Sequence, residues 1–102
     1  MTTYVLAQLR IHDRARYDRY AGQFLDVLRR FRGRLLAADE SPAVLEGEWP
    51  YQKVVLIEFE DADEAARWAE SAEYRRIAVD REASTEAIVL SVRGLHKWRA
   101  ST

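Results

Sequence analysis

In the first third of the chain, the spacing of the hydrophobic residues changes from every second position to every third or fourth position. Residues 3–11 carry apolar side chains at every second position, which is typical of a β-strand with one buried face. Asp13 is suited to cap a helix, and after it apolar residues recur every three or four positions. This spacing predicts an amphipathic helix whose apolar stripe includes Tyr17 and Tyr20 and which stops at Gly33.

The middle of the chain predicts two further strands. A second strand begins at Arg34, but the sequence Asp-Glu-Ser-Pro interrupts its apolar positions. Pro42 cannot donate a ladder hydrogen bond, so this strand is expected to be bulged, split or at a sheet edge. It is expected to resume through Val44 and to deliver Glu46 to its end. Residues 53–60 alternate most regularly and predict the third strand.

The second half predicts two helical segments and a last strand. Asp61 followed by Glu64 three residues later is a capping-box-like helix start, and Ser71 is suited to cap a second segment. Residues 87–95 predict the final strand. The order β-α-β-β-α-β predicts a ferredoxin-like α+β fold. In this fold the strand order of the four-stranded antiparallel sheet is 4-1-3-2, and both helical segments cover one face.

One domain is expected over residues 1–102, with a core at about 3–95 and a C-terminal tail at 96–102. Trp98 in this tail is expected to pack on a surface.

The sheet face without helices is expected to be apolar, because it would present Leu6, Val54 and Leu56 to water. A patch of this kind is larger than a monomer usually exposes. The sequence therefore predicts a homodimer in which two sheets stack face to face.

Composition and charge narrow the classes of partner. Hydrophobic residues make up 48% of the chain, which is typical of a folded domain. The net charge of −1 offers no field that would favour nucleic acid. No apolar run approaches the roughly 20 residues of a membrane span, so no membrane association and a cytoplasmic location are expected.

Neither a metal nor an organic cofactor is expected. The chain has no cysteine, and its two histidines, His12 and His96, are predicted at opposite ends of neighbouring strands. No glycine-rich turn precedes a helix, so a phosphate-binding loop is not predicted.

Several motifs together resemble a known family. In order they are Asp13-x3-Tyr-x2-Tyr, Gly33–Leu36, Leu45–Trp49, Val54–Asp61, Ala66–Tyr74 and Arg81. Their order and spacing are similar to those of the small bacterial domain-of-unknown-function family 1330, in the dimeric α+β barrel superfamily. The resemblance implies a dimeric barrel and no established activity. Superfamily relatives include cofactor-free quinol monooxygenases and haem-degrading enzymes that use an Asn/His/Trp constellation, but this chain contains no asparagine.

The predicted topology brings polar side chains to one end of the sheet, where the first strand finishes. His12 lies there, Tyr17 and Tyr20 follow at the start of the first helix, Glu46 arrives on the second strand and Arg81 on the second helical segment. A carboxylate, an arginine and two phenols suit an anionic or hydroxylated aromatic ligand. Each residue also has a structural interpretation: tyrosines in the core, a Glu46–Arg81 ion pair, a carboxylate that accepts turn donors, and a solvated histidine.

Two functional hypotheses remain from the sequence. In the first, the protein binds or transforms a small organic acid or phenol without a cofactor. Glu46 is then the candidate base, Arg81 holds the anion, and the tyrosines form the walls. In the second, the protein is a non-catalytic binding or protein-interaction module in which these residues satisfy one another. A cavity between helices and sheet favours the first hypothesis.

Overall fold

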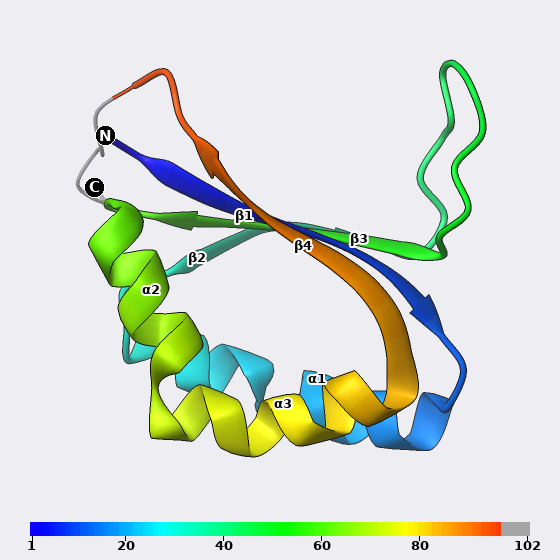
Figure 1. Cartoon of the computed structure of the whole chain (residues 1–102), viewed down its shortest axis with the longest axis horizontal. Helices are drawn as coiled ribbons and strands as arrows, with labels where there is room; N and C mark the ends of the chain where they lie inside the picture. Colours follow the sequence, from blue (N-terminus) through cyan, green and yellow to red (C-terminus); the bar gives the residue numbers. More distant parts are fainter. Residues whose placement is uncertain (97–102) are drawn as a thin grey trace.

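The computed structural model describes residues 1–96 and shows seven elements (Figure 1). They are β1 (Thr3–Ile11), α1 (Arg14–Arg29), β2 (Arg34–Asp39), β3 (Lys53–Phe59), α2 (Ala62–Glu70), α3 (Ala72–Ser84) and β4 (Thr85–Arg93). The expected packing of Trp98 falls outside the described residues.

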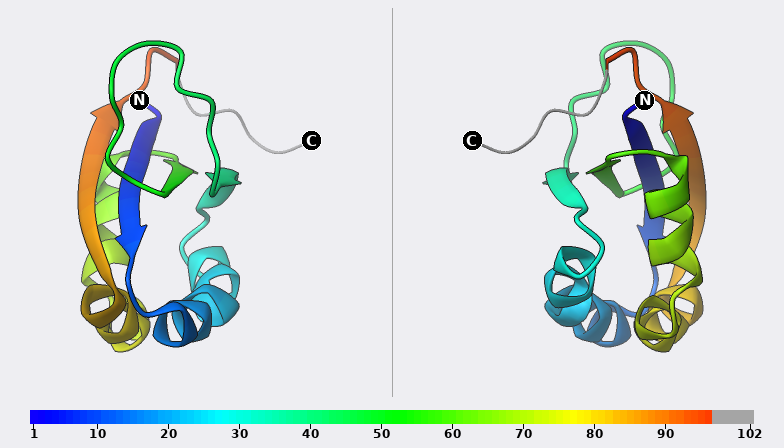
Figure 2. Two further views of the ribbon diagram at one scale, coloured as in Figure 1. Left: turned by 90° about the vertical axis from the view of Figure 1, so that its right-hand side faces the viewer. Right: turned by 90° about the vertical axis from the view of Figure 1, so that its left-hand side faces the viewer.

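The strands form one four-stranded sheet in the order β2-β3-β1-β4, and all neighbouring pairs are antiparallel. All three helices lie on the same side of this sheet (Figures 1 and 2). This confirms the ferredoxin-like α+β fold and places β2 at an edge, as Pro42 predicted.

The two faces of β1 have different neighbours. Val5 and Leu9 are buried beneath the helices, together with Ile57 and Phe59 of β3. Leu6 points to the other side, in register with Leu56 of β3 and Leu90 of β4. We call this second surface the helix-free face. It carries Tyr4, Leu6, Gln8, Val54, Leu56, Ile88, Leu90 and Val92, and on β4 its apolar side chains are exposed.

Each helix begins at the cap that the sequence predicts. The Asp13 carboxylate accepts a hydrogen bond from the backbone N–H of Arg16, and the Asp61 carboxylate accepts one from Glu64. The Ser71 hydroxyl accepts from the N–H of Tyr74 and so separates α2 from α3. These side chains satisfy backbone donors that a helix start leaves unpaired. Within residues 1–96, no helix has the length and hydropathy needed to span a bilayer.

The end of α1 differs from the expectation that Gly33 acts as the stop. The residue with a left-handed backbone there is Arg32, with φ of 60°. Gly33 instead lies so close to the core that a Cβ atom would be 2.4 Å from a methyl carbon of Leu28 and 2.9 Å from the Phe59 ring. Glycine is therefore required at position 33 by packing.

The second strand is shorter than the sequence predicts. The pairing of β2 with β3 shifts register between Leu35 and Ala37, which confirms a bulge. The strand then ends at Asp39, whose carboxylate accepts a hydrogen bond from the N–H of Ser41 and turns the chain out of the sheet. Residues 40–52, which we call the arm, connect β2 to β3. The expectation that β2 resumes and carries Glu46 to its end is therefore wrong.

We predict that Gly33→Ala lowers the free energy of unfolding by about 1–3 kcal/mol, because the new methyl group overlaps two fully buried side chains. Gly22→Ala is the matched control. It lies inside α1 with open space around its Cβ position, so it should stabilise the protein by about 0.5–1 kcal/mol. Chemical denaturation of both variants measures the difference, and equal effects would contradict the packing argument.

Candidate functional site

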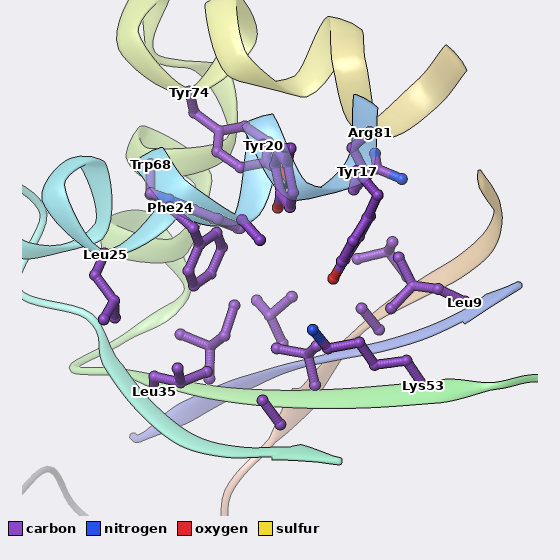
Figure 3. A pocket seen from close by; sticks show the side chains of 17 residues that line it. Leu9, Tyr17, Tyr20, Phe24, Leu25, Leu35, Lys53, Trp68, Tyr74 and Arg81 are labelled. Atoms are coloured by element: carbon purple, nitrogen blue, oxygen red, sulfur yellow. Dashed lines mark hydrogen bonds between the residues drawn. The ribbon is translucent and has the colours of Figure 1, made fainter. Parts of the chain in front are cut away.

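A cavity of about 160 Å³ lies between the helix-covered face of the sheet and the helices (Figure 3). Its floor is made by small or branched residues of the sheet, including Ala7, Ala38 and Val55. Its roof comes from aromatic side chains of the three helices. Large aromatic side chains hold the sheet and the helices apart, and the small floor residues do not fill the gap between these two layers.

The aromatic residues that separate these layers form a cluster at one end of the cavity. The ring of Trp68 in α2 lies 5.4 Å from that of Phe59 and 6.1 Å from that of Phe24, centroid to centroid. Trp68 also lies 4.2 Å from Tyr74 of α3. The indole N–H of Trp68 is buried and has no hydrogen-bond partner among the described residues. Buried donors are normally paired, so an unpaired indole N–H on a side chain that lines the cavity is unusual.

Two cationic side chains border the cavity from opposite layers. Lys53, the first residue of β3, has a side chain that is only 13% exposed, and its ammonium lies 4.8 Å from the centroid of the Tyr17 ring. Arg81 belongs to the last turn of α3. Its Nε atom is buried without a hydrogen-bond partner in the described part of the chain. Figure 3 shows Lys53 reaching up from the sheet toward Tyr17, and Arg81 entering from the helices.

The position of Arg81 is fixed by the contact between α1 and α3. Its neighbour in sequence, Asp80, accepts hydrogen bonds from Arg16 Nε at 3.0 Å and from Arg19 at 3.1 Å. The hydrogen bond from Arg16, and then that from Arg19, lower the pKa of the Asp80 carboxyl below its usual value. The carboxylate therefore stays charged and holds the two helices together beside the cavity.

Tyr20 contributes a protonated phenol. Its hydroxyl forms a hydrogen bond of 3.0 Å with that of Tyr74, and its ring packs 5.7 Å from those of Tyr17 and Phe24. Burial raises the pKa of Tyr20 well above its usual value of 10.0, and Tyr74 raises it further, whereas Arg81 acts in the opposite sense. Tyr20 is thus a hydrogen-bonding wall of the cavity and not a base at neutral pH.

Three of the five site residues expected from the sequence meet at this cavity, namely Tyr17, Tyr20 and Arg81. His12 does not line it. Its side chain is exposed at the end of β1, and its backbone N–H donates to the Ser84 carbonyl. Glu46 is exposed on the arm.

The expected Glu46–Arg81 ion pair is not formed within the chain, because the arm leaves the sheet at Asp39 and projects away from the helices (Figure 1). Glu46 borders a shallow groove of the arm together with Val44, Trp49 and Val54.

Lys53 is the main site residue that sequence reasoning missed. A signal was present, because Lys53 shares the face of β3 that carries Val55 and Ile57. A lysine on an otherwise buried face indicates either a snorkelling chain or a specific charge requirement. Metal ligation has no support here: among residues 1–96, no group of three or more potential ligands is placed to hold an ion.

The element order and the sheet topology define an α+β protein with a ferredoxin-like fold. The chain belongs to the family described as "Domain of unknown function (DUF1330)", whose model matches residues 2–95. No curated protein matches its sequence.

Solved structures with the same fold come from several bacteria. A protein of unknown function from Rhodopseudomonas palustris, RPA0582, has a TM-score of 0.79 at 15% identity, covering 93% of this chain and 83% of the other. A dimeric ferredoxin-like protein of unknown function from Jannaschia sp. has a TM-score of 0.69 at 19% identity, covering 92% and 100%. SnoaB, a cofactor-independent oxygenase from Streptomyces nogalater, has a TM-score of 0.68 at 10% identity, covering 94% and 95%. At these identities the likeness shows the fold alone.

We predict that stability falls in alkaline solution because of Tyr20. Below pH 10.0 Tyr20 is protonated in both the folded and the unfolded chain, so its contribution is fully present. As the pH rises above this value, the unfolded chain loses the proton while folded Tyr20 keeps it. The free energy of unfolding therefore decreases with rising pH until the pH reaches the folded pKa. Tyr20→Phe should cost about 1 kcal/mol at neutral pH through the lost hydrogen bond, but should show a shallower alkaline decline.

Denaturation curves between neutral pH and pH 11 measure this effect. Tyr51→Phe is the control, because Tyr51 is on the arm and does not line the cavity. A Tyr20→Phe variant with the same alkaline slope as the wild type would show that Tyr20 does not carry the effect.

Proposed function

We propose that the protein binds a single-ring aromatic acid or phenol in the cavity, without a metal or an organic cofactor. The observation that carries this proposal is the pair of cationic side chains, Lys53 and Arg81, at the border of an otherwise apolar cavity. An apolar cavity of about 150 Å³ accommodates benzene, so the volume of about 160 Å³ favours one ring.

The lining suggests how such a ligand would lie. Its ring would fit between the aromatic roof of Tyr17 and Phe24 and the aliphatic floor at Val55. Its carboxylate or ionised hydroxyl would take the hydrogen bonds that Lys53 and Arg81 can donate. The Trp68 indole N–H offers a further donor for a substituent on the ring.

The proposal is limited to binding because the cavity lacks the usual general bases. Among the described residues that line it there is no carboxylate and no imidazole. Cofactor-independent oxygenation is described for SnoaB, which shares the fold. Catalysis by this chain would need the ligand itself to supply the reactive anion, which the two cations would stabilise. Glu46 and His12 are not part of the proposed site.

We predict that benzoate binds more tightly than its neutral isostere benzamide, and that Lys53→Met reduces benzoate affinity at least about tenfold. The loss of a charge-assisted hydrogen bond is worth about 1.5–3 kcal/mol, and about 1.4 kcal/mol corresponds to a factor of ten. Lys53→Arg keeps the charge and should retain most of the affinity. Titration calorimetry measures all three proteins with both ligands.

Glu46→Gln is the matched control for this experiment, because Glu46 is an exposed residue outside the cavity. Its benzoate affinity should equal that of the wild type. The proposal fails if benzoate does not bind, if benzamide binds equally well, or if only Glu46→Gln weakens binding.

The proposed assembly is a homodimer that covers the helix-free face. Its support is the row of exposed apolar residues on β4, Ile88, Leu90 and Val92, continued across the sheet by Leu6 and Leu56. The Jannaschia protein of the same fold is described as dimeric.

We predict that Leu56→Asp dissociates the dimer, because the interface would bury an unpaired carboxylate at the centre of the sheet. Sedimentation equilibrium measures the mass. Val79→Asp is the control, since Val79 is an exposed apolar residue of α3 on the opposite side of the molecule. A wild-type protein that is monomeric at micromolar concentration, or a Leu56→Asp protein that stays dimeric, would contradict the proposed interface.

A further inference from the structure

The arm, residues 40–52, is anchored at its base. The backbone N–H of Gln52 donates to the Leu9 carbonyl at 2.8 Å, and the N–H of Ile11 donates to the Gln52 side-chain oxygen at 2.6 Å. The indole N–H of Trp49 donates to the Gln8 side chain at 2.7 Å. These three hydrogen bonds join the last residues of the β1 strand to the returning half of the arm, so the arm has a defined direction.

The tip of the arm presents an aliphatic side chain to water. Leu45 is 95% exposed, and Val44 beside it is also exposed. Gly47 has φ of 84°, which turns the chain back toward the sheet. A leucine at the tip of an anchored turn is unfavourable in water, because its whole apolar surface remains hydrated. Together with Val44 it makes the tip of the arm apolar, as a contact surface would be.

The arm stands on the helix-free side of the sheet. In Figure 1 it rises from the ends of β2 and β3, away from the helices, and both views of Figure 2 show it arching above the sheet. Trp49 is bonded to Gln8 of the helix-free face, and the groove of the arm includes Val54 of the same face. The arm and the helix-free face therefore form one continuous surface.

We propose that the arm of each protomer contacts a second copy of this chain, with Leu45 packed against the partner's Ile88. This inference rests on the homodimer proposed above. A copy that covers the helix-free face must meet the arm, because the arm stands above that face. The partner's contact surface then extends from the sheet to the arm.

The choice of Ile88 follows from the register together with a two-fold axis that runs along the strands, which is part of this proposal. Asp39, Val54, Gln8 and Ile88 form one row across the four strands, so the arm leaves the sheet level with Ile88. Two sheets that stack face to face about a two-fold axis along their strands place the β2 edge of one over the β4 edge of the other. The arm then reaches the start of the partner's β4.

The chemistry of the two ends of the face agrees with this placement. A two-fold axis across the strands would instead bring the arm over the opposite end of the partner's β2 edge. That end carries the ion pair between Arg34 and Glu58, which offers no apolar surface to a leucine. The β4 edge carries exposed Ile88 and Leu90. An aliphatic tip therefore matches β4, and the two-fold symmetry forms the contact twice.

The test uses single cysteines, which are informative because the natural chain has none. Leu45→Cys protein and an affinity-tagged Ile88→Cys protein are mixed, allowed to exchange subunits and oxidised under mild conditions. We expect a disulfide-linked heterodimer of distinct mass on a non-reducing gel. Leu45→Cys mixed with tagged Val79→Cys is the control and should give no heterodimer, because Val79 lies on α3.

A second measurement separates the arm from the sheet interface. Leu45→Ser should raise the dissociation constant of the dimer about tenfold, because a buried apolar contact is lost. Val79→Ser should leave it unchanged. A wild-type dimer that shows neither the cross-link nor weakening by Leu45→Ser overturns the arm contact and leaves the sheet interface standing. A monomeric wild-type protein overturns both, whereas benzoate binding is judged independently of either result.

Discussion

The separation between the helix layer and the sheet depends on the packing of Phe24, Phe59 and Trp68. These rings meet in tilted and edge-on arrangements, and they hold the layers apart at one end of the molecule. Further along the sheet the floor is built from Ala7 and Val55, which are too small to fill the same gap. A cavity is therefore the result of large residues at one end and small residues in the middle. The polar groups of the site take their positions from the elements that this packing holds in place.

The proposed site combines cationic side chains with an apolar lining. Lys53 and Arg81 border an apolar space, and the Nε of Arg81 and the indole N–H of Trp68 remain without partners in the described chain. Buried donors of this kind are unfavourable unless something accepts their hydrogen bonds. The Asp80 contact with Arg16 and Arg19 joins α3, and with it Arg81, to α1. Unpaired buried donors beside a cavity cost stability, and this is the feature on which the proposed binding site rests.

The sequence predicts local features well and long-range placement less well. The three caps, the bulged edge strand and the strand order were predictable, because each depends on residues close in sequence or on the handedness of crossovers. The inclusion of Tyr17, Tyr20 and Arg81 in one site followed from that topology. The position of Glu46 did not follow from the topology, because it depends on where β2 stops pairing with β3. Alternation suggested that the strand resumes after Pro42, but the turn at Asp39 ended it. Lys53 lies at a strand end, where a charged residue is usually solvated, so its alternation with Val55 does not by itself predict a place beside the cavity.

Glu40 connects two parts of the protein that have been described separately. It is the first residue of the arm, it forms an ion pair with Arg14 of α1, and its other oxygen lies 3.9 Å from the ammonium of Lys53. In the proposed complex, an anion in the cavity would compete with Glu40 for Lys53, so its binding would alter the charge balance at the base of the arm. Linkage requires such an influence to be reciprocal. If both proposals hold, a ligand that changes the free energy of the arm contact changes dimerisation by the same amount that dimerisation changes ligand binding, and the apparent ligand affinity would depend on protein concentration.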